Sequence, residues 1–142
     1  MHTWSIPRAL PRFLRSALAL CALVLAAAAA GPPVGEGAAL DPRQLVGSWR
    51  VDLRPSPGAP AYFQSFVVRS VEGGSFQGTF YGSEIKNGRI NTDWGAVRFA
   101  FTTEDVSGIY HHTGVLRDGA LEGTSHSLGR RFLAYWSAKP GE

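Results

Sequence analysis

The residues best suited to acid–base or metal chemistry in the body of the chain are three histidines, His111, His112 and His126. Neighbouring residues on a β-strand point to opposite faces, so His111 and His112 cannot bind one ion together inside a barrel. At best one of them joins His126, and no pair of carboxylates stands nearby at a spacing that would complete a coordination shell. The sequence therefore predicts no metal site and no cofactor, and it favours histidines that are satisfied by hydrogen bonds.

A nucleophile for hydrolysis is also difficult to assign. Ser125 or Ser127 can be combined with a histidine and Asp93, but almost any sequence contains such a set. The Gly-x-Ser-x-Gly turn that exposes a catalytic serine does not occur in the sequence. We therefore predict no catalytic residue. Whether the chain is an enzyme stays open, with a non-enzymatic role favoured.

Polar side chains interleaved with aromatic ones instead indicate a binding site for a small molecule. Asp93 and Trp94 stand at a strand end, where a carboxylate and an aromatic face together can orient a small polar ligand. The run 124–127 (TSHS) is polar for a late strand and suits the mouth of a barrel; a solvent-facing strand is the alternative. Burial in the core is the alternative for the aromatic candidates. The predicted ligand-binding residues are Asn91, Asp93, Trp94, Tyr110, His112, Ser125 and Trp136.

Short runs of aromatic and β-branched residues must position these side chains. From Gln44 onward such runs are broken every eight to twelve residues by Gly, Asn, Asp or Pro, which is typical of an antiparallel sheet. No long window has the 3.6-residue period of a helix. Gly73-Gly74, Asn87-Gly88 and Asp118-Gly119 predict hairpin turns. The predicted strands are 44–54, 62–71, 75–85, 89–94, 96–103, 108–116, 121–127 and 131–138.

Short antiparallel strands joined by tight turns leave two exposed edges unless the sheet closes on itself. We therefore predict an all-β fold, a small eight-stranded antiparallel up-and-down barrel, with a two-sheet β-sandwich as the alternative. Such a barrel has an interior just wide enough for its own side chains or for one small ligand. Large aromatic residues are expected to fill it, namely Trp49, Phe80, Phe99, Phe101 and Phe132.

The first thirty residues have a different composition from the rest. A start with three arginines precedes an apolar run over 17–30, which ends in three alanines and is followed by Gly-Pro-Pro. The run is shorter than the roughly 20 residues of a membrane-spanning helix, so an uncleaved anchor is only the alternative. We predict a signal peptide over 1–30, cleaved near Ala30, and a secreted or periplasmic product. A flexible leader over 31–43 and a barrel domain over 44–139 follow.

Removal of residues 1–30 changes the charge and the cysteine content. Lys+Arg falls from 14 to 11 against 11 Asp+Glu, so the remaining domain has no formal net charge. The only cysteine, Cys21, is removed as well; the bulky Leu20 before it does not suit lipid attachment. The domain must therefore be stabilised by packing without disulfides. Neither nucleic acid nor a membrane is an expected partner, and no stable membrane anchor is predicted.

Three stretches resemble the calycin-type barrels, the group of the lipocalins and avidins. Gly47-Ser48-Trp49 is similar to the Gly-x-Trp start of these families. The stretch 74–80 (GSFQGTF) resembles the hairpin pattern of the avidins, in which Gly and an apolar residue are followed by Gly-Thr-aromatic. The stretch 89–94 (RINTDW) resembles part of streptavidin. The resemblance implies a barrel over 44–138 with Trp49 packed across one end. It does not imply biotin binding, because Val51 and Pro55 stand where the avidins have Asn and Ser.

These observations together predict an exported, non-enzymatic β-barrel that binds a small apolar or amphipathic ligand at its open end. One alternative is a protein-binding module, such as a periplasmic inhibitor of an exported enzyme, that inserts the arm 31–43 into a partner. Another alternative is an isomerase or cyclase that shapes its substrate inside the barrel. The sequence does not indicate an oligomeric state.

Overall fold

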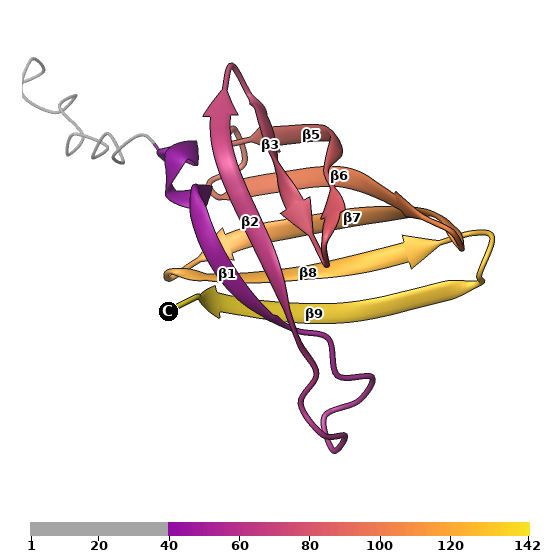
Figure 1. Ribbon diagram of the computed structural model, residues 1–142. Helices are drawn as coiled ribbons and strands as arrows, with labels where there is room; N and C mark the ends of the chain where they lie inside the picture. The colour runs from indigo at the N-terminus through magenta and orange to yellow at the C-terminus, as the bar shows by residue number, and fades with distance from the viewer. Residues whose placement is uncertain (1–39) are drawn as a thin grey trace, which may run out of the picture. The chain divides into compact units, whose positions relative to one another are not determined.

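Alternating buried and exposed side chains build nine strands within residues 40–142, the part of the chain that the computed structural model describes (Figure 1). The predicted signal peptide over 1–30 and residues 31–39 of the predicted leader lie outside the described residues. A short 3-10 helix, η1 (Pro42–Leu45), precedes the strands. The strands are β1 (Gly47–Asp52), β2 (Phe63–Glu72), β3 (Ser75–Phe80), β4 (Ser83–Glu84), β5 (Lys86–Asn91), β6 (Val97–Asp105), β7 (Gly108–Arg117), β8 (Ala120–Ser127) and β9 (Phe132–Pro140).

Eight of these strands close into an antiparallel barrel, as the sequence predicts. From β5 to β9 each strand pairs with the next, β9 pairs with β1, and β1, β2 and β3 follow one another. The ring closes between β3 and β5 through one ladder pair, Ser75 with Arg89, and through the Ile90 N–H, which donates to the Gly74 carbonyl at 2.8 Å. The short β4 pairs with β3 alongside this ring. The alternative of two separate sheets is therefore wrong.

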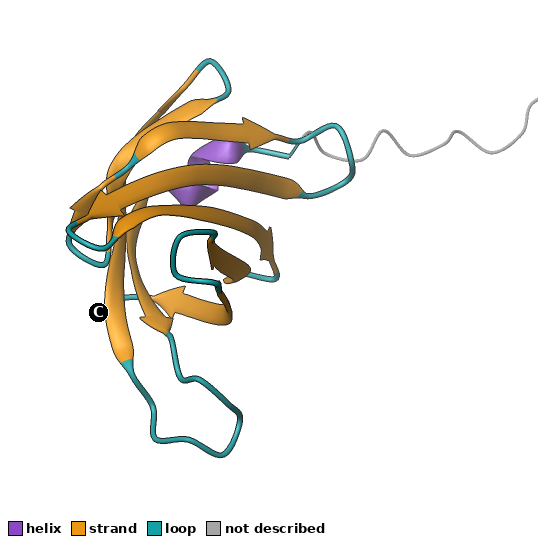
Figure 2. Ribbon diagram, turned by 90° about the vertical axis from the view of Figure 1, so that its right-hand side faces the viewer, coloured by secondary structure: helices purple, strands orange, loops and turns teal. Residues whose placement is uncertain are grey.

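The two ends of the barrel differ in the connections that they carry (Figure 2). We call the end with η1 and the turns 73–74, 92–96 and 118–119 the closed end. The end with the loop 53–62 and the turns 81–82, 106–107 and 128–131 is the open end. β1 runs from the closed end to the open end and β9 runs back, since Trp49 pairs with Pro140 and Asp52 pairs with Ser137.

The closed end is sealed by η1 and the first strand. Asp41 caps η1 by accepting a hydrogen bond from the Arg43 N–H at 2.9 Å, and Pro42 suits the first helical position. Leu45 is fully buried, and its carbonyl accepts a hydrogen bond from the Trp49 indole N–H at 2.9 Å. The predicted strand over 44–54 therefore begins only at Gly47, because Gln44 and Leu45 belong to η1.

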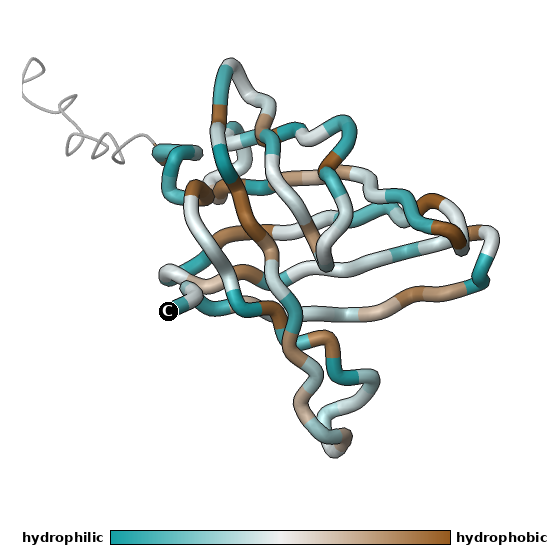
Figure 3. Tube along the Cα trace, in the orientation of Figure 1, coloured by the Kyte–Doolittle hydropathy of each residue, from teal (hydrophilic) through white to brown (hydrophobic). Residues whose placement is uncertain are grey.

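An aromatic cluster fills the interior next to the closed end. Phe66 lies at its centre, and the distances from its ring centroid to those of the neighbouring rings are 5.4 to 6.4 Å. The residue belongs to the hydrophobic middle of β2 (Figure 3). The predicted core residues Trp49, Phe80, Phe99 and Phe101 are buried, whereas Phe132 is 39% exposed at the open end, so its assignment to the core is wrong. The cluster consists of Phe66, Phe76, Phe80, Phe99, Phe101 and Trp136.

The predicted hairpin turns are confirmed at two positions and wrong at the third. Gly73-Gly74 and Asp118-Gly119 connect neighbouring strands, and all four residues have positive φ. Asn87-Gly88 instead forms a bulge inside β5, because the ladder to β6 passes from Lys86–Thr102 directly to Arg89–Ala100. A residue with positive φ serves a bulge as well as a turn.

The hairpin of this region lies earlier, at Tyr81-Gly82, which interrupts the predicted strand 75–85. Tyr81 has φ 53° and Gly82 has φ 80°, so both central residues have the positive φ of a type I′ turn. The predicted strand 96–103 also ends too early, since β6 continues to Asp105 and the chain reverses at Val106-Ser107.

Candidate functional site

A cavity of about 880 Å³ lies at the open end of the barrel. Its size falls within the range of roughly 300–1,000 Å³ that is usual for small-molecule sites. Residues from β3, β6, β7, β8 and β9 form its inner wall, and the loop 53–62 covers one side. The lining residues are Asp52, Leu53, Arg54, Pro55, Ser56, Pro57, Tyr62, Phe80, Tyr81, Ser83, Thr103, Asp105, Tyr110, His112, Ser125, Arg130, Phe132, Leu133, Ala134, Tyr135 and Ser137.

His112 forms the floor of this cavity. Its ring packs against two aromatic side chains that also contact each other, at 4.5 Å from the Phe101 centroid in a stacked arrangement and at 4.6 Å from the Phe80 centroid. Only 3% of the residue is exposed. The imidazole therefore separates the aromatic cluster on the closed side from the cavity on the open side.

Both ring nitrogens of His112 face hydroxyl groups. Nε2 lies 2.9 Å from Thr103 Oγ1, and Nδ1 lies 2.7 Å from Ser125 Oγ. Thr103 and Ser125 are themselves buried. Burial, with a smaller contribution from the nearby His111, lowers the pKa of His112 from 6.5 to about 4. The floor of the cavity is therefore polar but uncharged at neutral pH.

One side of the rim is a chain of hydrogen bonds around Tyr110. Its hydroxyl accepts a hydrogen bond from Arg130 Nη1 at 2.6 Å and lies 2.9 Å from Ser107 Oγ. The hydrogen bond to Tyr110 raises the pKa of Arg130. Asp105 accepts a hydrogen bond from the Ser107 N–H at 2.7 Å, and the bonds to the Ser107 side chain and backbone lower the pKa of Asp105.

The rim also includes a tyrosine pair and an ion pair. The hydroxyls of Tyr62 and Tyr81 are hydrogen-bonded, which raises the pKa of Tyr81, and the two rings meet edge to face. Arg54 Nε donates to Asp52 Oδ2 at 2.8 Å, and this bonding lowers the pKa of Asp52. The charges of the lining carboxylates, Asp52 and Asp105, are therefore balanced in number by the guanidinium groups of Arg54 and Arg130.

The wall of the cavity is incomplete between β1 and β9. The ladder between these strands extends from Trp49–Pro140 to Asp52–Ser137 and stops there. Within residues 40–142, the start of β9 from Phe132 to Trp136 has ladder partners on β8 alone. Figure 1 shows this half of β9 reaching beyond β1. The exposed side chains of Leu133 and Tyr135 belong to this edge and also line the cavity.

The structure brings three of the predicted site residues together. Tyr110, His112 and Ser125 all line the open-end cavity. His111 and His126 lie opposite each other in the ladder between β7 and β8, on exposed positions, while His112 faces inward. Within residues 40–142, no three potential ligating side chains are grouped around a common point.

The other four predicted residues lie elsewhere. Asn91, Asp93 and Trp94 stand at the closed end, where the Asp93 N–H donates to Asn91 Oδ1 at 3.1 Å and Trp94 is 77% exposed. Trp136 is fully buried in the aromatic cluster, and its indole N–H has no acceptor among residues 40–142. The sequence places these residues at strand ends or among polar neighbours, but it does not reveal at which end of the barrel they lie.

Sequence reasoning missed Thr103 and the rim residues Asp105 and Arg130. A signal for Thr103 existed: Val97, Phe99 and Phe101 alternate on the inner face of β6, and Thr103 continues this series as its first polar member. A polar residue at the end of an inward apolar series indicates where packing gives way to a cavity. No comparable signal distinguishes Arg130 from other loop arginines.

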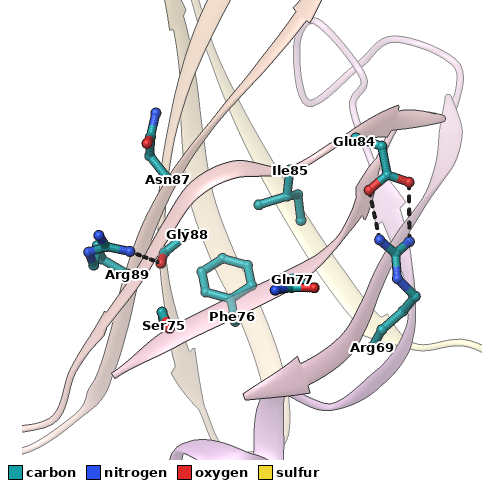
Figure 4. Close-up of a pocket in the computed structure, with 9 residues that line it drawn as sticks. All are labelled: Arg69, Ser75, Phe76, Gln77, Glu84, Ile85, Asn87, Gly88 and Arg89. Atoms are coloured by element: carbon teal, nitrogen blue, oxygen red, sulfur yellow. Dashed lines mark hydrogen bonds and ion pairs between the residues drawn. The ribbon is translucent and has the colours of Figure 1, made fainter. Parts of the chain in front are cut away.

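Two other hollows lie outside the barrel interior. One of about 310 Å³ lies where β3 and β5 share a single ladder pair (Figure 4). Arg69 and Glu84 form a two-bonded ion pair there, with Nη2 and Oε2 at 2.7 Å. Gly88 contacts β3 so closely that a Cβ would lie 2.3 Å from the Phe76 carbonyl oxygen.

A groove of about 700 Å³ lies over β5 to β9 and includes Asn91 and Tyr135. Neither hollow includes a buried polar side chain.

No protein-family model matches the chain, and neither the curated proteins nor the solved structures give a significant match. The closed eight-stranded antiparallel barrel is consistent with a calycin-like fold. No helix within residues 40–142 is long and apolar enough to cross a membrane.

Proposed function

We propose that this chain is an exported β-barrel that binds a small apolar or amphipathic molecule at its open end without altering it chemically. The observation that carries the proposal is the cavity of about 880 Å³ with Thr103, His112 and Ser125 buried in its floor. Aromatic side chains such as Phe80 provide apolar surface, and a few convergent polar groups fix orientation, which is the usual construction of a small-molecule site.

Binding is favoured over catalysis by the partners of His112. Both of its ring nitrogens are engaged by uncharged hydroxyls, and no carboxylate among residues 40–142 is hydrogen-bonded to the ring. A general base needs a pKa near the working pH, whereas the pKa of His112 is about 4. An isomerase or cyclase remains the less favoured proposal.

Membership in the lipocalin and avidin group is part of the same proposal. Support comes from the position of Trp49, which lies at the closed end and donates to the Leu45 carbonyl, as the resemblance of Gly47-Ser48-Trp49 implies. The composition of residues 1–30 supports export to the periplasm or the exterior. Biotin is not proposed as the ligand, since Val51 is buried in the core.

A protein partner is the second candidate, and the free edge of β9 favours it. An unpaired strand can accept an extended peptide through its backbone groups. Leu133 is 72% exposed on this edge. In this case the start of β9, or the predicted arm 31–43, would contact an exported protein, and a pull-down with variants of either segment would reveal it.

The proposal is tested with N-phenyl-1-naphthylamine, a neutral apolar probe that fluoresces when it leaves water. Ala134 lines the cavity, so the substitution Ala134→Trp fills it, and we expect the affinity for the probe to fall by about tenfold or more. Ala100→Trp adds the same side chain on the exposed outer face of β6 and serves as the matched control. Equal binding by both variants, or no binding by the original protein, would contradict the proposal.

A further inference from the structure

The hydrogen-bonded network of Thr103, His112 and Ser125 in the cavity floor contains one more donor proton than its own hydrogen bonds use. A neutral imidazole carries one N–H donor and one nitrogen acceptor. The hydroxyl that faces the acceptor nitrogen donates its proton to the ring. The hydroxyl that faces the N–H accepts a hydrogen bond and keeps its own proton. One of the two hydroxyls, on Thr103 or on Ser125, therefore always has a proton left to donate.

No side chain or carbonyl within residues 40–142 accepts this remaining proton. The only hydrogen bonds of Thr103 Oγ1 and Ser125 Oγ in the described part of the chain are those to His112. Thr103 is 5% exposed and Ser125 is 4% exposed, and both line the cavity. Ser127 on the same face of β8 differs, since its hydroxyl donates to the Ile109 carbonyl at 3.0 Å.

We propose that the cavity takes a neutral ligand with a carbonyl or hydroxyl oxygen, which enters with this oxygen first and accepts the remaining proton of the Thr103–His112–Ser125 network. This inference rests on the proposed function, because it names the chemical class of the ligand for the same cavity. Leaving a buried donor without an acceptor is unfavourable, so a ligand that supplies the acceptor is selected over a hydrocarbon of the same shape.

An anionic ligand fits this floor less well in either orientation. With its carboxylate inward, the negative charge would be buried beside uncharged groups without a cation. With its carboxylate outward, near Arg130 on the rim, its apolar end would cover the remaining hydroxyl proton. The uncharged floor and the charge-balanced rim therefore favour a neutral polar group over an acid.

Three matched compounds distinguish these ligand classes by displacement of N-phenyl-1-naphthylamine. 2-Acetonaphthone carries a ketone, 2-isopropenylnaphthalene replaces this oxygen by a CH₂ group of similar shape, and 2-naphthoate carries an acid. We expect the ketone to bind about five- to tenfold more tightly than the hydrocarbon, as one added hydrogen bond allows, and 2-naphthoate to bind most weakly.

Variants of the network test whether the preference comes from these hydroxyls. In the triple variant Thr103→Val, His112→Phe and Ser125→Ala the preference for the ketone should disappear, because no hydroxyl and no imidazole N–H is left to donate to its oxygen. If this variant does not fold, the triple variant with His112→Leu in place of His112→Phe makes the same test. Thr124→Ala, on the exposed face of β8, is the control and should keep the preference.

The outcomes separate this inference from the proposed function. Probe binding without a preference for the ketone, tightest binding of 2-naphthoate, or a preference retained in the variants would overturn the inference while leaving the cavity as a binding site. A failure of the probe itself to bind would remove the proposed function, and the inference with it. A ketone preference that is lost only in the network variants supports both.

Discussion

The two halves of the barrel are built from the same strands but are filled differently. Along β6 the inward residues change from Val97, Phe99 and Phe101 to Thr103, and along β8 they change from Leu121 to Ser125 and Ser127. On these two strands the large side chains lie toward the closed end and the small polar ones toward the open end. An eight-stranded interior is just wide enough for its side chains, so small hydroxyls leave a cavity where rings would have filled the space.

The comparison also separates stability from binding. Burial of aromatic side chains stabilises the closed half, where Phe66 contacts five other rings. The open half contains the buried polar residues of the described chain, and such groups stabilise a fold little when hydrogen-bonded. The barrel is thus expected to hold its shape through one half and to bind its ligand with the other.

The largest expected effect is on the closed half. Phe66→Ala removes a fully buried ring at the centre of the aromatic cluster and should lower the free energy of unfolding by about 4 kcal/mol. Phe132→Ala makes the same change at the open rim, where the residue is 39% exposed, and should lower it by about 1 kcal/mol. Urea unfolding measures both, and similar losses would break the distinction between the halves.

A smaller effect is expected from the pH dependence of stability, because His112 is uncharged when folded. Its pKa is 6.5 when unfolded and about 4 when folded, so the unfolded state binds more protons between these values. The free energy of unfolding is therefore highest above pH 6.5 and falls toward pH 4, with a contribution of up to about 3 kcal/mol from this residue.

His112→Phe is the variant that isolates this contribution, since other groups also titrate at low pH. The difference in unfolding free energy between the original protein and the variant should change across the interval from pH 6.5 to about 4 and stay constant above it. A difference that does not depend on pH would mean that the imidazole is accessible to water, and the floor of the cavity would have to be placed elsewhere.

The smallest expected effect concerns the residues that the sequence assigned to the site but that lie at the closed end. Trp94→Ala removes a side chain that is 77% exposed, so the free energy of unfolding should change by less than about 0.5 kcal/mol. Binding of N-phenyl-1-naphthylamine should also be unchanged. Weaker binding by this variant would indicate a ligand site at the closed end or on the adjoining outer groove.

The sequence was sufficient for the fold because its signals are local. Two-residue alternation marks strands such as β6, and Gly-Gly or Asp-Gly marks the turns at 73–74 and 118–119. The error at Asn87-Gly88 has the same origin, because positive φ at Asn87 serves a bulge as well as a turn. A local pattern does not reveal which of the two the neighbouring strands require.

The site was harder to predict because it depends on distant pairing. His112 and Ser125 were identified as polar residues of late strands, but their partner Thr103 comes from β6, and only the register between β6, β7 and β8 brings the three together. Asp93 and Trp94 have equally suitable chemistry and lie at the other end of the barrel. Residue type indicates what a side chain can do, whereas strand direction and register decide where it acts.

The most direct test of a packed closed half and a ligand-binding open half is a map of backbone amide chemical shifts on addition of 2-acetonaphthone. The account predicts the largest changes at Thr103, His112 and Ser125, with Leu45 and Trp94 unchanged. Changes concentrated at the closed end, or on the outer face around Arg98 and Tyr135, would contradict it.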